Sequence, residues 1–380
     1  MDIRESQMER VGLMQLKSLF RKTFRTSTVL ITGHTGFKGG WLSLWLESLG
    51  ADIVGYSLDP PGTPSFFEVA RLSDHITDIR GDIRDYDKLS ETIGKYRPDF
   101  IFHLAAQPIV RESYHQPLET FSVNVMGTAV LLESIRKIPE DTVCVCITSD
   151  KCYENREWSH AYRETDPLGG YDPYSASKAA AEIVIASYRS SFFNGSESGS
   201  QVRPVASARA GNIIGGGDWA QDRIVPDCIR SLAEGKDILL RNPAAVRPWQ
   251  FVLEPLAGYL LLACKMREDP SSYSDAWNFG PWHTSTVDVR SLAGMIARAW
   301  GGGKCRIAPG MKMQPHEANC LKLDIAKSVA GLGWRPVYSI DEAVSQTVDW
   351  YRHYYAGDSD MYRFSRDQIA GYIKKSAEMS

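Results

Sequence analysis

The stretch Thr28-Val-Leu-Ile-Thr-Gly-His-Thr-Gly-Phe-Lys-Gly-Gly40 decides the fold of this chain. It begins with a short β-branched run and then places glycines at intervals of three, at Gly33, Gly36 and Gly39. Apolar residues at helical spacing follow, so the pattern predicts a strand, a tight turn and a helix. Glycine permits such a turn and lets a pyrophosphate approach the backbone, while the helix N-terminus supplies N–H groups. The turn is therefore predicted to hold a dinucleotide.

The spacing of these glycines is G-x-x-G-x-x-G rather than the more usual G-x-G-x-x-G, so the prediction depends on its context. Asp59 lies 20 residues after Gly39, at the end of a second apolar run. An acidic side chain at that place can bond the adenosine ribose and would favour NAD over NADP. Asp59 also precedes two prolines and a glycine, so it can equally be the first residue of an ordinary turn.

The composition excludes several classes of protein. The chain has 380 residues with 43 basic and 46 acidic side chains, so its charge predicts neither a nucleic-acid nor a membrane partner. No apolar run approaches the roughly 20 residues of a membrane span, and no secretory signal is recognised. Seven cysteines without paired spacing are typical of a reducing cytoplasm, where we expect the protein. No cluster of residues predicts a metal site.

Strands and helices alternate through the first half of the chain, which is the pattern of an α/β fold with a doubly wound parallel sheet. A smaller α+β lobe is expected after it, and apolar residues at helical spacing from Leu13 to Phe24 indicate a docked or frayed extension before it. We predict an N-terminal extension at 1–27, a Rossmann domain with the catalytic residues at 28–210, a mainly substrate-binding lobe with segments returning to the sheet at 211–356, and a C-terminal tail at 357–380.

Two segments carry the candidate catalytic residues. An apolar strand ends at Ser149, and a helix starting near Pro173 carries Tyr174 and Lys178, which a spacing of four places on one helix face. A phenol has a pKa of ~10, and a neighbouring ammonium together with a positive nicotinamide would lower it toward the range of a working base. A Tyr-x-x-x-Lys pair is common by chance, and the glycine turn and the strand-end serine before it make it specific.

Other residues are placed to contact the cofactor. Small side chains at Ala105 and Ala106 end a strand and leave room for a cofactor at the sheet edge. Asp82 can accept a hydrogen bond from an adenine amino group, or can be a solvated turn residue. The predicted cofactor-binding residues are Gly33, Thr35, Gly36, Phe37, Lys38, Gly39, Asp59, Asp82, Ile83, Leu104, Ala105, Ala106, Gln107, Tyr174 and Lys178.

These motifs resemble those of the extended short-chain dehydrogenase/reductases, which act on nucleotide sugars. Four segments are similar to those of the CDP-glucose 4,6-dehydratase family, namely Gly33–Trp45, Thr148–Asn155, Arg209–Trp219 and Arg247–Gln250. The resemblance implies an NAD-dependent lyase. Tyr174 would take the proton of the glucose 4-hydroxyl as a hydride leaves C4, water would leave across C5 and C6, and the hydride would return to C6 to give CDP-4-keto-6-deoxyglucose.

The elimination of water needs an acid for the leaving hydroxyl and a base for the C5 proton. The residues after Ser149, Asp150 and Lys151, are the candidates. Asp150 would have to be protonated near neutrality, and Lys151 would need a lowered pKa, to which Lys178 would contribute. Lys151 can alternatively stabilise an enolate as a charged group. The corresponding pair in the dTDP-glucose branch resembles Asp-Glu.

The lobe is expected to hold the diphosphate of the substrate, because the planar fork of arginine binds phosphate bidentately. The predicted substrate-binding residues are Arg111, Ser113, Asn212, Arg223, Arg241 and Arg247. The resemblance further implies a homodimer formed through two helices that flank the sheet. It also implies a place in deoxysugar biosynthesis for a surface polysaccharide such as the lipopolysaccharide O-antigen.

Two other functions are compatible with parts of the pattern. A dTDP-, UDP- or GDP-sugar 4,6-dehydratase or a 4-epimerase of the same fold would also use Ser149, Tyr174 and Lys178, although an epimerase needs no acid–base pair after the serine. A cofactor-sensing binding protein would need neither the tyrosine nor the lysine. The choice of CDP rests on the resemblance and on no contact derived from the residues.

Overall fold

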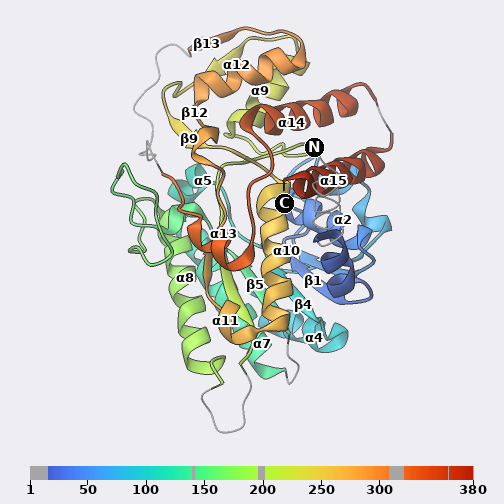
Figure 1. The fold of residues 1–380 in the computed structure, drawn as a ribbon, viewed down its shortest axis with the longest axis vertical. Coiled ribbons are helices and arrows are strands. Elements are labelled where there is room, and N and C mark those ends of the chain that lie inside the picture. The colour runs from blue at the N-terminus through green and yellow to red at the C-terminus, as the bar shows by residue number, and fades with distance from the viewer. Residues whose placement is uncertain (1–15, 139–141, 196–201, 308–320, 358, 380) are drawn as a thin grey trace, which may run out of the picture.

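The computed structural model describes residues 16–138, 142–195, 202–307, 321–357 and 359–379 (Figure 1). Its centre is a parallel sheet of seven strands in the order β11-β6-β5-β4-β1-β2-β3. This sheet confirms the predicted α/β fold with a doubly wound sheet. The strands are β1 (Thr28–Thr32), β2 (Asp52–Ser57), β3 (Thr77–Arg80), β4 (Phe100–His103), β5 (Val143–Ile147), β6 (Val205–Arg209) and β11 (Ala276–Asn278).

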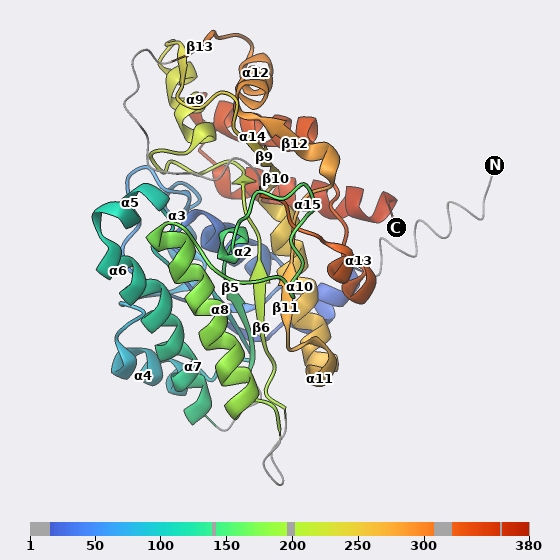
Figure 2. The ribbon, with the colours of Figure 1, turned by 90° about the vertical axis from the view of Figure 1, so that its left-hand side faces the viewer.

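Helices cover both faces of this sheet, as the view in Figure 2 shows. One face packs against α2 (Phe37–Ser48) and α10 (Leu253–Glu268), and the other against α4 (Tyr86–Tyr96), α7 (Gly127–Lys137) and α8 (Pro173–Phe192). Strand side chains alternate between the faces, so Val29 and Ile31 enter the first core and Leu30 enters the second. Both faces are buried, which explains why the strands are continuous apolar runs.

The second lobe lies beyond the carboxyl ends of the strands, at the top of Figure 1. Its short strands pair as β7 (Ile213–Ile214) with β10 (Gln250–Phe251), β8 (Ile238–Leu240) with β13 (Cys305–Ile307), and β9 (Val246–Pro248) with β12 (Thr286–Asp288). The helices α9 (Ile224–Ala233), α12 (Val289–Trp300) and α14 (Ile340–Tyr355) pack around them. Between these segments the chain returns to the sheet as α10 and β11.

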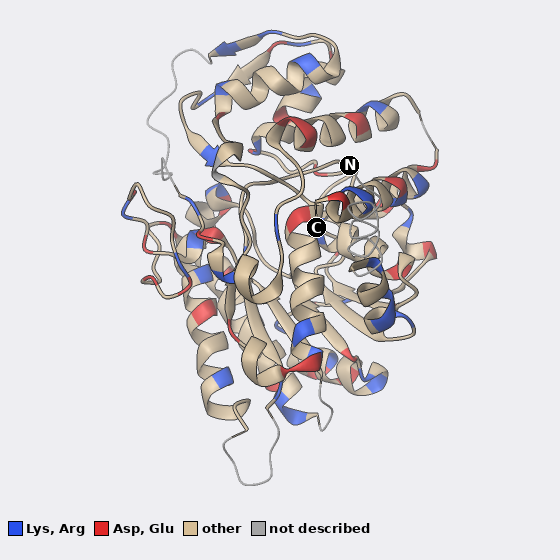
Figure 3. Ribbon diagram, viewed as in Figure 1, with Lys and Arg blue, Asp and Glu red and all other residues tan. Residues whose placement is uncertain are grey.

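Shorter helices connect these elements. They are α3 (Phe66–Val69), α5 (Val110–His115), α6 (Pro117–Phe121), α11 (Pro270–Tyr273) and α13 (Ala326–Leu332), with one π-helical segment at Ser122–Met126. Lys, Arg, Asp and Glu are interspersed over the ribbon (Figure 3), in keeping with the near balance of 43 basic and 46 acidic residues. Among the described residues, no helix is both long enough and apolar enough to cross a membrane.

The first and last helical segments that the structure describes dock on the α2 side of the sheet. Residues 16–24 are helical, and Phe20 and Phe24 are fully buried against Trp45 and Phe100. The C-terminal helix α15 (Met361–Glu378) packs against α2 and α14. The predicted apolar position Leu13 lies outside the described residues.

A buried carboxylate ties α15 to the rest of the core. Glu254, near the start of α10, accepts hydrogen bonds from the backbone N–H of Val337 (3.0 Å) and Tyr338 (2.7 Å) and from the hydroxyl of Tyr372 in α15 (2.9 Å). Burial raises the pKa of Glu254 from 4.5 to about 7. The carboxyl group that binds the C-terminal helix therefore changes its protonation near neutral pH.

We expect Glu254 to make the stability of the protein depend on pH. Since its pKa is higher in the folded chain than the value of 4.5 for an unperturbed glutamate, the folded state binds the proton more tightly. The resulting stabilisation is complete below pH 4.5 and is lost as the pH rises through about 7. It amounts to roughly 3 kcal/mol in the free energy of unfolding.

Urea denaturation at pH 5 and at pH 8 measures this effect. Glu254→Gln carries no titrating group, so its free energy of unfolding should change less between the two conditions than that of the wild type. Glu268→Gln, an exposed position at the end of the same helix, is the control and should behave as the wild type. Equal pH dependence in the wild type and in Glu254→Gln would contradict this assignment.

Candidate active site

The glycine turn after β1 packs so closely that side chains are excluded from it. A Cβ atom at Gly33 would lie 2.7 Å from the Ala105 nitrogen, and one at Gly39 would lie 2.1 Å from the Gly33 carbonyl oxygen. Gly33 also has a φ of 78°, which favours glycine. Gly36 immediately precedes α2 and has no side chain to cap it, so the first N–H groups of this helix are left for a bound anion.

Three cationic side chains converge beside this turn. They are Lys38 of α2, Lys178 of α8 and Arg223, which immediately precedes α9. Burial, with the charges of Lys178 and Arg223, lowers the pKa of Lys38 to about 7, while the carboxylate of Asp150 acts in the opposite direction. Burial also lowers the pKa of Lys178 to about 8, against the charge of Glu182. This concentration of positive charge fits a dinucleotide pyrophosphate.

The start of α8 positions Tyr174. The side chain of Asp172 caps the helix by accepting a hydrogen bond from the Ser175 N–H (2.9 Å), and Pro173 occupies the first helical position. Tyr174 and Lys178 are both buried, and the Tyr174 phenol shares a hydrogen bond with Ser149. The structure therefore brings Ser149, which follows β5, to the hydroxyl that was predicted to act as a base.

The electrostatics of Tyr174 differ from the expectation in one respect. Burial raises the pKa of Tyr174 to about 12, and the hydrogen bond with Ser149 acts against this shift. The charges of Asp150 and Asp172 also raise this pKa, and that of Arg223 lowers it. The predicted net lowering of this pKa is not seen in the protein alone, because burial outweighs the groups that act to lower it.

Asp150 is held between the ends of two neighbouring strands. Its side chain is buried, and its Oδ1 accepts a hydrogen bond from the Ser149 hydroxyl (3.0 Å). Its Oδ2 accepts one from the Asn212 amide (3.2 Å), in the loop after β6. A Cβ at Gly211 would lie 2.1 Å from the Asp150 Cγ, so glycine is needed for this approach. The serine, the carboxylate and the amide thus form one hydrogen-bonded group.

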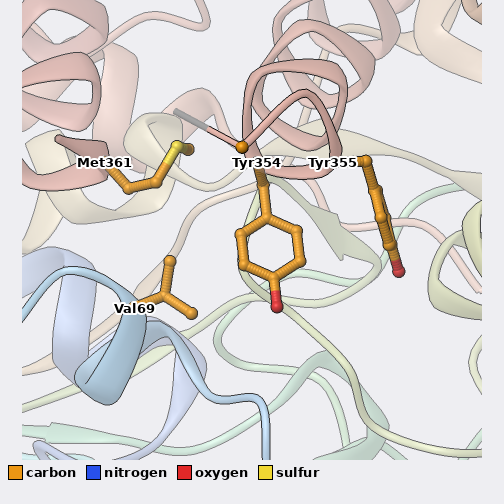
Figure 4. A pocket seen from close by; sticks show the side chains of 5 residues that line it. Val69, Tyr354, Tyr355 and Met361 are labelled. Carbon is orange, nitrogen blue, oxygen red and sulfur yellow. The ribbon is translucent and has the colours of Figure 1, made fainter. Parts of the chain in front are cut away.

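A cavity of about 190 Å³ opens beside this group. It brings together two predicted catalytic residues, Asp150 and Lys151, and two predicted substrate-binding residues, Asn212 and Arg247. The rest of its lining is Tyr153, Asn155, Glu157, Gly170, Tyr171, Asp172, Ser175 and Leu321. A separate hollow of about 450 Å³ lies between α3, α14 and α15, lined by Val69, Tyr354, Tyr355, Gly357 and Met361 (Figure 4), and contains none of the candidate residues.

The other predicted arginines meet acidic partners. Arg111 of α5 and Arg241, which follows β8, both pair with Asp222, the former at 3.1 Å. Arg223 pairs with Asp218 at 2.9 Å and also faces Tyr174. Asp222 therefore joins Arg111 of the sheet domain to Arg241 of the lobe. The sequence analysis did not identify this carboxylate.

Ser113 does not line the cavity beside Asp150. It is fully buried, and its hydroxyl donates a hydrogen bond to the Val110 carbonyl of its own helix (2.6 Å).

The predicted cofactor-binding residue Asp82 accepts two hydrogen bonds from the Arg84 guanidinium, at 2.9 and 2.6 Å. This neighbour lowers the pKa of Asp82. The carboxylate of Asp82 thus already binds an arginine, and its contact with an adenine amino group stays a prediction.

The remaining predicted cofactor residues follow the ends of β1, β2, β3 and β4. The Gln107 backbone is fixed by a hydrogen bond from its N–H to Asn124 (2.8 Å). The Thr35 hydroxyl shares a hydrogen bond with Ser57 (2.9 Å), the last residue of β2. Asp59 is 90 % exposed and approaches Arg80 at 3.5 Å. Hence Ser57, and not Asp59, is the side chain at the end of β2 that contacts the glycine turn.

A buried ion pair behind the site was missed by the sequence reasoning. Glu182 lies one helical turn after Lys178, and its carboxylate binds Arg209 of β6 at 2.8 Å, with both side chains almost fully buried. It also accepts hydrogen bonds from Thr148 (2.5 Å) and Ser207 (2.7 Å). The pair ties α8 to β5 and β6. The sequence feature that could have revealed this pair is an acidic residue, Glu182, four positions after Lys178 on an otherwise apolar helix face.

A parallel sheet with a glycine turn after β1, and a tyrosine and lysine one helical turn apart beside a strand-end serine, define a short-chain dehydrogenase/reductase. The chain belongs to the GDP-mannose 4,6 dehydratase family, whose family model matches residues 30–347. This finding confirms the family that the motifs predicted.

Individual relatives agree with this assignment. The chain is 46% identical over 345 residues to the CDP-glucose 4,6-dehydratase of Salmonella typhimurium. This match covers 91% of this chain and 96% of that protein. It is 26% identical over 344 residues to a dTDP-glucose 4,6-dehydratase of Xanthomonas campestris, covering 86% of this chain and 93% of the relative. A structure of dTDP-glucose 4,6-dehydratase from Streptomyces venezuelae with NAD and TYD bound has a TM-score of 0.73 at 23% identity, covering 86% of this chain and 97% of that one, which supports the fold.

Proposed function

We propose that this protein is an NAD-dependent hydro-lyase that converts CDP-glucose into CDP-4-keto-6-deoxyglucose. The observation that carries the proposal is that Asp150 and Lys151 line one cavity, while Ser149 hydrogen bonds to Asp150 and both residues act on the Tyr174 phenol. The reaction needs both an alcohol base and an acid–base pair for elimination. The identity of 46% to a CDP-glucose 4,6-dehydratase supports the choice of nucleotide.

The residues of the glycine turn fit NAD. The Gly33 and Gly39 positions admit no side chain, the N-terminus of α2 has no side-chain cap among the described residues, and Lys38 adds a positive charge. When bound, NAD accepts the hydride from C4 of the sugar and returns it to C6. Neighbouring structures of the same fold were solved with NAD bound.

The side chains of the site have separate roles in this proposal. Tyr174 takes the proton of the 4-hydroxyl, and Ser149 orients that hydroxyl by hydrogen bonding. Asp150 protonates the hydroxyl that leaves C6, and Lys151 either removes the C5 proton or stabilises the enolate. Asn212 and Arg247 border the same cavity and bind the substrate there.

The assay that tests the function uses CDP-glucose with deuterium at C4. The expected product is CDP-4-keto-6-deoxyglucose with deuterium at C6 and no net formation of NADH. Parallel assays with dTDP-, UDP- and GDP-glucose establish which nucleotide the lobe selects. Formation of CDP-galactose would instead identify a 4-epimerase, and product without deuterium at C6 would contradict the internal hydride transfer.

We expect Lys151→Ala to separate the two halves of the reaction. Oxidation at C4 depends on Tyr174, so it should proceed, whereas loss of water should slow by about 10² or more because a group that acts on C5 is removed. Mass spectrometry should detect a 4-keto sugar that retains its C6 oxygen. Lys236→Ala, in an exposed segment of the lobe, is the control. Normal dehydration by Lys151→Ala would exclude both roles proposed for Lys151.

We also propose that the protein forms a homodimer through the α7 and α8 side of the sheet. Large apolar side chains are exposed on this side, at Leu118 of α6, Met126 before α7, and Ile183 and Phe192 of α8. Exposed apolar patches commonly mark protein interfaces.

A cytoplasmic location is supported by the cysteines of the described segments, none of which forms a disulfide. The supply of a deoxysugar to a surface polysaccharide such as the O-antigen stays a prediction.

A further inference from the structure

Gln250 is a buried side chain that the proposed function does not use. It lies in β10 of the second lobe and is only 2% exposed. Its Nε2 donates hydrogen bonds to the carbonyl oxygens of Gly211 and Phe279, each at 3.0 Å. Gly211 lies just after β6 and Phe279 just after β11, and these two strands are neighbours in the central sheet. A single amide group therefore binds the carboxyl ends of both strands to the lobe.

The backbone of Gln250 holds the same loop after β6. Its N–H donates a hydrogen bond to the Asn212 carbonyl (3.1 Å), and Gln250 pairs with Ile213 in the parallel ladder of β10 and β7. Two successive carbonyl groups, those of Gly211 and Asn212, are thus bound by one residue, the first through its side chain and the second through its backbone. Because an amide has two donor hydrogens and both are used here, the Gln250 side chain is fixed in one orientation.

The loop that Gln250 holds is the one that packs on Asp150. The Asn212 amide donates to the Asp150 Oδ2 (3.2 Å), and a Cβ atom at Gly211 would lie 2.1 Å from the Asp150 Cγ. The Gly211 backbone therefore lies directly against the carboxyl group. A shift of this loop would displace the carboxyl group or remove its hydrogen bond from Asn212. A displacement of about 1 Å in an active site can slow a reaction by ~10².

We propose that Gln250 is a positioning residue for the loss of water. It holds the loop of Gly211 and Asn212 against Asp150, so that this carboxyl group keeps the place from which it protonates the C6 hydroxyl. The inference rests on the proposed function, in which Asp150 is the acid of the elimination. Oxidation at C4 depends on Tyr174 of α8, so Gln250 acts mainly on the second half of the reaction.

The test compares the two halves of the reaction in Gln250→Met, which keeps the approximate length of the side chain and removes both amide donors. With CDP-glucose in a single turnover, the absorbance of enzyme-bound NADH follows C4 oxidation, and mass spectrometry follows the loss of water. Elimination should slow about tenfold or more relative to oxidation, so that a 4-keto sugar with its C6 oxygen accumulates. Without substrate, hydrogen exchange of the backbone N–H groups at 211–214 should be faster than in the wild type.

Gln250→Glu is a second variant with a pH readout. A protonated glutamic acid can donate one hydrogen bond to a carbonyl oxygen, whereas its ionised form can donate none. The ratio of elimination to oxidation should therefore fall in this variant as the pH rises, and it should fall more steeply than in the wild type. Should Gln250→Met fail to fold, this pH profile decides the question.

Gln368→Met is the matched control. Gln368 of α15 is also buried, and its Nε2 donates to the Gln346 carbonyl (2.7 Å). As at Gln250, its Oε1 has no hydrogen-bond partner among the described residues. The control should lose stability without a change in the ratio of elimination to oxidation.

Two results separate this proposal from the proposed function. If Gln250→Met slowed both halves of the reaction equally, or if neither variant of Gln250 changed their ratio, Gln250 would have only a structural role and the proposal would be wrong. A wild type that transfers no deuterium from C4 to C6 would overturn the proposed function itself, and this proposal with it.

Discussion

Replacement of Tyr174 by phenylalanine is expected to lower turnover of CDP-glucose by about 10² or more, the usual contribution of a positioned base. The substitution removes the phenolic oxygen that shares a hydrogen bond with Ser149 and keeps the volume of the ring. Because burial raises the pKa of Tyr174 to about 12, this hydroxyl is protonated in the protein alone at neutral pH. The activity of the wild type should therefore rise with pH, since a larger fraction of the base is then ionised.

Tyr171→Phe is the matched control for this substitution. Tyr171 lies three residues earlier and lines the cavity beside Asp150, but its side chain is largely exposed. The control should retain turnover within a fewfold of the wild type, and both variants should bind the nucleotide as before. Turnover by Tyr174→Phe within tenfold of the wild type, with the same product, would show that another group takes the 4-hydroxyl proton.

The elements that the sequence predicted best are those decided by local patterns. The glycine turn, the buried strand ending before Ser149 and the helix beginning at Pro173 each follow from residues adjacent in the chain. Parallel strands covered on both faces must be apolar throughout, so their sequence pattern is strong. The family resemblance rested on the same segments and is confirmed by the match to residues 30–347.

The parts that could not be predicted depend on pairing between distant segments. The register of β2 against the glycine turn decides that Ser57, and not Asp59, contacts Thr35. Asp222 joins Arg111 to Arg241 across 111 and 19 residues of sequence. Ser113 was predicted to bind substrate because it is a polar residue in the sequence. Only the structure shows that it is fully buried and that its hydroxyl hydrogen bonds within its own helix.

The second large effect is expected at the buried pair of Glu182 and Arg209. Arg209→Met leaves the Glu182 carboxylate buried without its cation, and such a change typically costs about 3–5 kcal/mol in the free energy of unfolding. The remaining hydrogen bonds from Thr148 and Ser207 are neutral and cannot replace the guanidinium. Urea denaturation of the wild type and of Arg209→Met measures the loss.

The double variant Glu182→Leu, Arg209→Met separates the cost of an unpaired charge from the value of the pair. With both charges gone no buried ion lacks a partner, so the double variant should be more stable than Arg209→Met, although Thr148 and Ser207 then lose an acceptor. The half-buried surface pair of Glu133 and Arg136 is the control, because Glu133→Gln should cost less than about 1 kcal/mol. If Arg209→Met were as stable as Glu133→Gln, the buried pair would not hold α8 to the sheet. The placement of Tyr174 and Lys178 would then depend on the cap at Asp172 and on packing.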